Sequence, residues 1–208
     1  LNGITQKTYE SITRTRGSFA KALRTIHRLK KDGINLVLKA NCLKQNKHEI
    51  GMIKAFAERT LGNSSLHEYR FKFDPLILPR LNKDKTPCQY RLSFDELLAI
   101  RKQDPEIWQE FEQSMCHQDT HLLRKPQYLY HCNSWLSNFF IDPFGSLRFC
   151  QLLDKFSVNL RTASFARAFY HDFPKVAALK FKAKSPCRSC GLRRYCQHCP
   201  GKAYLETG

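Results

Sequence analysis

Cysteines near the end of the chain have the spacing of metal ligands. Four of the nine cysteines form two Cys-x-x-Cys pairs, Cys187/Cys190 and Cys196/Cys199, with five residues between the pairs. A zinc ribbon separates its pairs by roughly 12 to 20 residues so that two knuckles can face each other. The short gap and the closing Cys199-Pro200 are instead typical of ferredoxin runs, whose last cysteine serves a different cluster. The pattern therefore favours iron–sulfur clusters, with zinc as the alternative.

Two further cysteines flank a predicted hairpin. Segments 139–142 and 146–150, each with apolar residues, flank a Pro-Phe-Gly turn that ends at Gly145. This is a strand–turn–strand pattern, and a glycine at that point is free to adopt a positive φ. We expect Cys150 at the end of the second strand, while Cys132 lies before the first.

Residues 1–115 alternate between predicted helices and strands. The first long helix is expected between an N-cap at Ser18 and a stop at Gly33. A strand, a helix and a strand should follow, at about 34–40, 48–61 and 66–73. This order predicts parallel strands joined by crossover helices, as in a doubly wound sheet or a (β/α) barrel. Two strands cannot close such a sheet, so we expect the fold to begin before Leu1.

The cysteines resemble the SPASM domain of radical S-adenosylmethionine enzymes that modify peptides. The matching pattern is Cys132-x12-Gly145-x4-Cys150, followed by Cys187-x2-Cys190-x5-Cys196-x2-Cys199. Segment 199–208 is similar to the end of many such domains. Earlier residues resemble the later strands of the radical-enzyme barrel: Leu1-Asn2-Gly3, Gly17-Ser18-Phe19, Gly33-Ile34 and Asn46.

The resemblance implies an α/β protein with two domains. Residues 1–115 would be the C-terminal half of a radical-SAM (β/α) barrel that is incomplete in this chain, and residues 116–130 a linker. Residues 131–208 would be a small α+β SPASM domain with a β-hairpin and a cysteine-rich loop, truncated at its end.

The resemblance also implies how the cysteines divide between two auxiliary 4Fe-4S clusters. The first cluster would be held by Cys132, Cys150 and Cys199, and the second by Cys187, Cys190 and Cys196. The second cluster's fourth ligand in the family is a later cysteine, which this sequence does not reach. For the first cluster, the remaining position would be open or filled by Cys116, His131 or a substrate thiol.

Other residues limit the implied activity. The Cys-x3-Cys-x2-Cys loop that binds the catalytic cluster and S-adenosylmethionine is absent from the sequence, so this chain alone should not generate a radical. Gln151 follows Cys150, where sulfatase-maturing relatives carry an acid, which argues against that activity. Lys39 and Asn41 lie at the C-terminal end of a predicted barrel strand, where such barrels place their sites, and are predicted to contact the cofactor.

The formal charge of +17 indicates which classes of partner the chain can attract. Such a charge attracts nucleic acid, anionic membranes or an acidic peptide. The family resemblance favours a peptide or protein substrate, an acidic leader peptide and an electron donor protein. The rival is a zinc-stabilised nucleic-acid-binding module, which explains the charge more directly but gives no reason for the spacing of Gly145 and Cys150.

Compartment and membrane association follow from simpler features. No run of 18 or more apolar residues is present, so no membrane span is expected. The first residues lack a signal peptide, and an odd number of cysteines argues against a secreted disulfide scaffold. We therefore expect a cytoplasmic protein.

Overall fold

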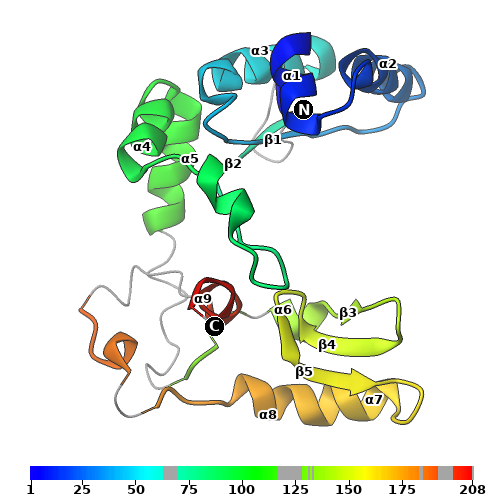
Figure 1. The fold of residues 1–208 in the computed structure, drawn as a ribbon, viewed down its shortest axis with the longest axis vertical. Helices are drawn as coiled ribbons and strands as arrows, with labels where there is room; N and C mark the ends of the chain where they lie inside the picture. Colours follow the sequence, from blue (N-terminus) through cyan, green and yellow to red (C-terminus); the bar gives the residue numbers. More distant parts are fainter. Residues whose placement is uncertain are drawn as a thin grey trace. The chain divides into compact units, whose positions relative to one another are not determined.

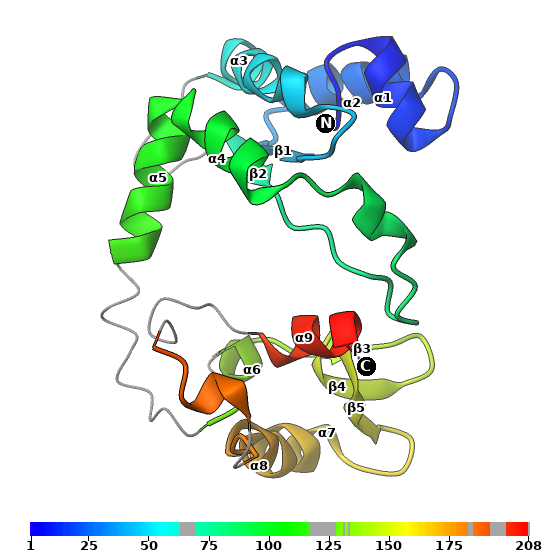
Figure 2. The ribbon, with the colours of Figure 1, turned by 60° about the vertical axis from the view of Figure 1, so that its left-hand side comes forward.

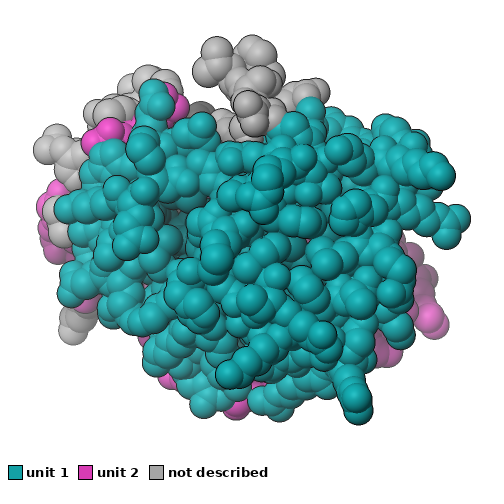
Figure 3. Space-filling view, turned by 90° about the horizontal axis from the view of Figure 1, so that it is seen from above, with its two compact units in different colours: residues 1–77, 87–111 teal, residues 78–86, 112–208 magenta. Residues whose placement is uncertain are grey.

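The computed structural model describes residues 1–62, 70–116, 128–130, 132, 134–182, 185–191 and 199–207. Within these ranges the chain is a mixed α/β protein with one two-stranded and one three-stranded sheet (Figure 1). It divides into two compact units, which are coloured separately in Figure 3. The first unit contains residues 1–77 and 87–111, and the second contains residues 78–86 and 112–208. Among the described residues, no helix has the length and apolar character needed to cross a membrane.

The sheet of the first unit confirms the predicted parallel pairing. Strand β1 (Leu38–Asn41) pairs in parallel with β2 (Phe71–Asp74). Between them lie the 3₁₀ helix η1 (Lys47–Glu49) and helix α3 (Ile50–Leu61). Apolar residues of α3 and both strands form the core of this unit, because burying them removes apolar surface from water. The fully or nearly fully buried members are Leu38, Ala40, Ile50, Ile53, Ala57 and Phe71.

Strand β1 is shorter than the sequence predicts. The strand expected from residue 34 begins only at Leu38, and Ile34 and Val37 remain exposed. Phe71 is the partner of Leu38, so the described pairing starts there. The first part of the other predicted strand, residues 66–69, lies outside the described residues.

The first unit contains further helices. They are α1 (Gln6–Thr13), α2 (Ser18–Lys31), α4 (Phe94–Lys102) and α5 (Pro105–Cys116), with the 3₁₀ helix η2 (Thr86–Tyr90).

The start of α2 corrects one prediction. Its N-cap is Gly17, which has a positive φ of 76°, and Ser18 is the first residue of the helix. The predicted stop is confirmed, because the helix ends at Lys31 and Gly33 has a φ of 72°.

The second unit contains an antiparallel sheet in the order β3-β4-β5. Its strands are β3 (Phe140–Ile141), β4 (Ser146–Cys150) and β5 (Leu153–Asn159). A helical stretch runs along this sheet, as Figure 2 shows. It comprises α7 (Phe165–Arg167), the π-helical segment η4 (Ala168–Asp172) and α8 (Phe173–Ala177). The remaining elements are α6 (Ser134–Ser137), the 3₁₀ helix η5 (Pro186–Arg188) and α9 (Pro200–Thr207).

The predicted hairpin between β3 and β4 is confirmed. Gly145 has a φ of 85°, the left-handed conformation that favours glycine. The buried Asp142 carboxylate accepts hydrogen bonds from the backbone N–H groups of Phe144 (2.9 Å) and Ser146 (3.0 Å). It also pairs with the Arg148 guanidinium at 2.7 Å. These contacts fix the turn and therefore the direction of β4, which ends at the predicted ligand Cys150.

Candidate metal site

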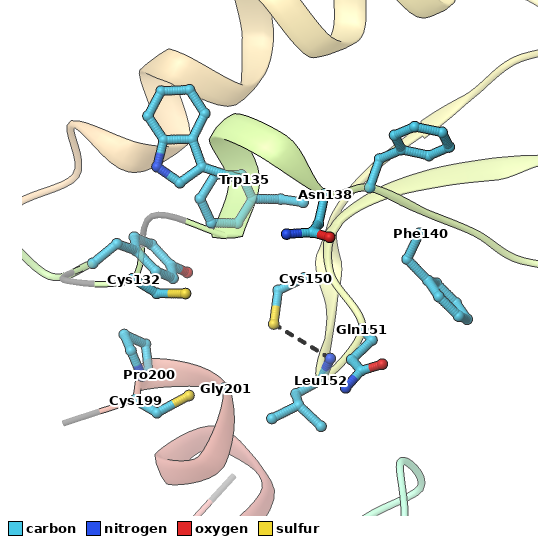
Figure 4. A pocket seen from close by; sticks show the side chains of 13 residues that line it. Cys132, Trp135, Asn138, Phe140, Cys150, Gln151, Leu152, Cys199, Pro200 and Gly201 are labelled. Atoms are coloured by element: carbon cyan, nitrogen blue, oxygen red, sulfur yellow. Dashed lines mark hydrogen bonds between the residues drawn. The ribbon is translucent and has the colours of Figure 1, made fainter. Parts of the chain in front are cut away.

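Three cysteines from separate elements line one pocket of the second unit (Figure 4). Cys132 precedes α6, Cys150 ends β4, and Cys199 precedes α9. The pocket has a volume of about 460 Å³. The fold thus brings together the three thiols that the family resemblance assigns to the first auxiliary cluster.

Cys150 is held by the tight connection between β4 and β5. It pairs with Leu153 across the turn, and a register shift between Arg148 and Cys150 marks a bulge. The Cys150 Sγ accepts a hydrogen bond from the backbone N–H of Leu152 at 3.4 Å. Amide donors to sulfur are typical of thiolates that ligate iron–sulfur clusters, where they adjust the reduction potential.

The pKa of the Cys150 thiol is raised above its usual value. Burial is the main cause that raises the pKa of Cys150, the Leu152 amide opposes it, and the charges of Cys199 and Cys132 raise it further. Without a cation the Cys150 thiol therefore stays protonated at neutral pH. A bound metal reverses this preference, because a coordinated thiol is deprotonated.

Gly201 allows Cys199 to approach Cys150. A Cβ at position 201 would lie 2.9 Å from the Leu152 Cβ and 3.6 Å from the Cys150 Sγ. The first turn of α9 therefore reaches the turn after β4 only because residue 201 has no side chain. The buried Leu205 anchors the other end of α9.

Aromatic side chains form much of the remaining wall of the pocket. Trp135 is stacked on Phe149 with 6.2 Å between the ring centroids, and Tyr130 meets Phe149 edge to face at 5.0 Å. The other lining residues outside the cysteines are Asn138, Phe139, Phe140, Gln151, Leu152, Pro200 and Gly201. Tyr130 and Phe149 are buried and keep water from their side of the pocket, whereas Phe139 and Phe140 are exposed.

Sequence reasoning missed Tyr130, which falls in the predicted linker 116–130. The structure places it in the core of the second unit. Tyr128 forms a β-bridge with Lys180, and the Leu129 N–H donates to the Leu179 carbonyl at 2.7 Å. The apolar Leu129-Tyr130 pair directly before Cys132 is the signal that could have indicated a buried segment there.

The second predicted cluster is not assembled by the described residues. Cys187 is half-buried and Cys190 is exposed, and neither lines the pocket. Cys196, the third predicted ligand, lies outside the described residues, as does His131. Cys42 and Cys88 belong to the first unit, where burial raises the pKa of Cys42 to about 12, as for an ordinary core thiol.

Zinc sites and iron–sulfur sites differ in how their ligands are spaced. Within the described ranges, no group of three or more His, Cys, Asp or Glu side chains is arranged to hold one metal ion. A zinc site needs its ligands around one point, at about 2.3 Å for sulfur. In a 4Fe-4S cluster each cysteine binds a different iron, so the ligands surround a larger volume. The three cysteines of the pocket are candidate ligands for either kind of site.

Lys39 and Asn41 lie at the C-terminal end of β1. The Lys39 ammonium pairs with the Asp74 carboxylate at 2.5 Å, at the end of β2. The Asn41 N–H donates to the Asn2 side-chain oxygen, and its carbonyl accepts from the buried Asn46 side chain. Their predicted contact with the cofactor stays a prediction.

Comparison of the chain with protein-family models, curated proteins and solved structures gave no match.

Proposed function

We propose that this chain is the iron–sulfur-binding part of a radical S-adenosylmethionine enzyme that modifies a peptide or protein. In this proposal Cys132, Cys150 and Cys199 hold an auxiliary 4Fe-4S cluster. One observation carries the proposal: these cysteines, distant in sequence, line the same pocket.

The surroundings of the three thiols support iron and sulfide. The Leu152 N–H donates to the Cys150 sulfur, and glycine at 201 leaves room beside it. When bound, a 4Fe-4S cluster supplies one-electron transfer at a potential set by hydrogen bonds and solvent exposure. The chain's own contribution is to hold the cluster through thiolates, to donate hydrogen bonds to sulfur and to limit water with the aromatic wall.

The arrangement of elements also supports the family. We assign the first unit to the C-terminal half of a radical-SAM (β/α) barrel, because its parallel strands are joined through α3. We assign the second unit to a SPASM domain, because a β-hairpin delivers one cysteine to a site completed by later segments. Lys39 and Asn41 would then face bound S-adenosylmethionine at the C-terminal end of the barrel strands.

The basic surface supports an acidic leader peptide as a partner. The basic face of α2 carries Lys21, Arg24, Arg28 and Lys31, and all four are exposed. Exposed charges of one sign attract acidic peptides through interactions that salt screens. The modified peptide or protein is the substrate, and an electron donor protein supplies the cluster's electrons.

Anaerobic reconstitution tests the proposal against the zinc alternative. The full chain is incubated either with iron and sulfide or with zinc, desalted, and analysed for metal and acid-labile sulfide. We expect brown protein that retains iron and sulfide in equal amounts. Colourless protein that retains one zinc and no sulfide would instead identify a zinc module.

A further inference from the structure

The hairpin of the second unit exposes large apolar side chains at the edge of its sheet. Among the described strands, β3 has one neighbour, β4, so the other side of β3 is open. Phe140 and Ile141 form β3 and are 38% and 44% exposed, and Phe144 in the turn is 77% exposed. Natural proteins cover or charge such edges, because an open edge is a template for pairing with another chain. An apolar edge therefore indicates a binding surface.

The backbone of Ile141 faces the open side of β3. The Asp142 N–H donates to the Ser146 carbonyl at 3.0 Å across the hairpin. Successive residues of an antiparallel strand direct their backbone groups to opposite sides, so the N–H and C=O of Ile141 point away from β4. An extended peptide laid along β3 can exchange a pair of hydrogen bonds with these two groups.

The open edge is continuous with the pocket of the three cysteines. Phe139 and Phe140 line that pocket together with Cys150. Residues that pair across neighbouring strands place their side chains on the same face of the sheet. A strand added to β3 therefore places one of its side chains beside Phe140, on the face that lines the pocket.

Charge selects the class of peptide. The exposed Arg161 lies against the turn, with its Nε 3.7 Å from the position that a Cβ on Gly145 would take. Asp142, the one acidic residue of the hairpin, is buried and pairs with Arg148. A second copy of the chain would carry the same charge of +17, so repulsion opposes pairing between two copies. A peptide with both carboxylates and apolar side chains matches the edge.

We infer that an acidic peptide with apolar side chains binds in an extended conformation along β3, as an added strand of this sheet. Its backbone exchanges hydrogen bonds with Ile141, its apolar side chains cover Phe140 and Phe144, and its carboxylates lie near Arg161. The binding step needs no cluster, and only the peptide's role as a substrate rests on the proposed function.

Fluorescence anisotropy of the full reconstituted chain tests the inference. The probe is a short fluorescein-labelled peptide in which glutamate and valine alternate. Ile141→Thr keeps a β-branched side chain but removes apolar surface, so it should weaken binding about fivefold, the effect of one cross-strand pair. Val37→Thr is the matched control, because Val37 is 46% exposed and lies in the first unit. Val37→Thr should leave the affinity unchanged.

A second probe makes the test independent of how any variant folds. Methylating the backbone nitrogens of the peptide removes the N–H groups that an added strand donates, and should weaken binding about tenfold. Equal affinity for the methylated and parent peptides, or equal affinity of the two variants, would overturn the inference. A dimer that Ile141→Thr dissociates in sedimentation would also overturn it, because a second copy would then occupy the edge. Peptide binding by a chain that retains no iron would support the inference and contradict the proposed function.

Discussion

Cys150 ends β4 and lines the pocket together with both other proposed ligands, Cys132 and Cys199. Cys150→Ala should remove a first-cluster ligand and abolish that cluster, because a three-cysteine set has no spare thiolate. The expected result is a clear loss of iron and sulfide after anaerobic reconstitution. Cys88→Ala is the control: this cysteine belongs to the first unit and should leave the iron content unchanged. Equal iron in both variants would exclude Cys150 as a ligand.

Glu49 illustrates a buried carboxylate with a structural role. It is only 2% exposed and accepts hydrogen bonds from the Ile4 N–H (2.6 Å) and the hydroxyls of Thr5 (2.9 Å) and Thr8 (2.6 Å). Burial alone would raise the pKa of Glu49, but these hydrogen bonds outweigh it and lower the pKa below the usual 4.5. The carboxylate therefore joins α3 to the start of α1.

Glu49→Ala should lower the free energy of unfolding of the first unit by roughly 2–4 kcal/mol, because several donors lose a charged acceptor. A lowered pKa contributes stability above the unfolded-state value of 4.5, and that contribution is lost as the pH falls through the folded-state pKa. The difference from wild type should therefore shrink below about pH 4.5. Denaturant unfolding at several pH values measures this difference in the free energy of unfolding.

Asp32→Ala provides the comparison, since it removes only an exposed ion pair with Arg28 at 3.8 Å. Asp32→Ala should lower the free energy of unfolding by no more than about 0.5 kcal/mol. A Glu49→Ala effect of the same small size would contradict the assigned role.

At the scale of elements, the first turn of α9 must lie against the turn after β4. Gly201→Ala should reduce iron incorporation, because the new Cβ would meet the Leu152 Cβ at 2.9 Å and separate Cys199 from Cys150. Gly191→Ala is the matched control, since a Cβ there meets nothing within 4 Å. Iron analysis of both reconstituted variants measures the difference. Full incorporation in Gly201→Ala would show that the close approach is not needed.

Local patterns predicted several elements correctly. The hairpin follows from a turn whose glycine must adopt a positive φ, and the parallel pair follows from the order of strand, helix and strand. The start of α2 was placed one residue too late, because Gly17 can itself cap a helix in the left-handed conformation. The beginning of β1 was placed too early, because β-branched composition does not show where a partner strand starts.

The meeting of the three cysteines could not be derived from local patterns. It depends on the reversal between Cys150 and Leu153 and on the contact of Gly201 with Leu152, both of which are tertiary features. Only the family resemblance grouped these cysteines in advance. Tyr130 was missed because the residues before it have no periodicity, and a single buried tyrosine has no sequence signature.

At the scale of the whole molecule, each unit has its own hydrophobic core. The proposed cluster contacts the core of the second unit alone, so its binding energy should stabilise that unit. Removing iron with a chelator should speed amide hydrogen exchange in β4 and α9 and leave α3 unchanged. Hydrogen-exchange mass spectrometry of the chain with and without iron measures this. Equal changes in α3 and β4 would contradict a cluster confined to the second unit.

The most direct test of the central claim is the Mössbauer spectrum of the chain reconstituted with ⁵⁷Fe. The comparison is between a triple variant with alanine at Cys132, Cys150 and Cys199 and a double variant with alanine at Cys187 and Cys190. We predict that a 4Fe-4S component of the wild-type spectrum is absent from the triple variant and present in the double variant. A triple variant whose spectrum matches wild type would contradict the claim that these three cysteines hold a cluster.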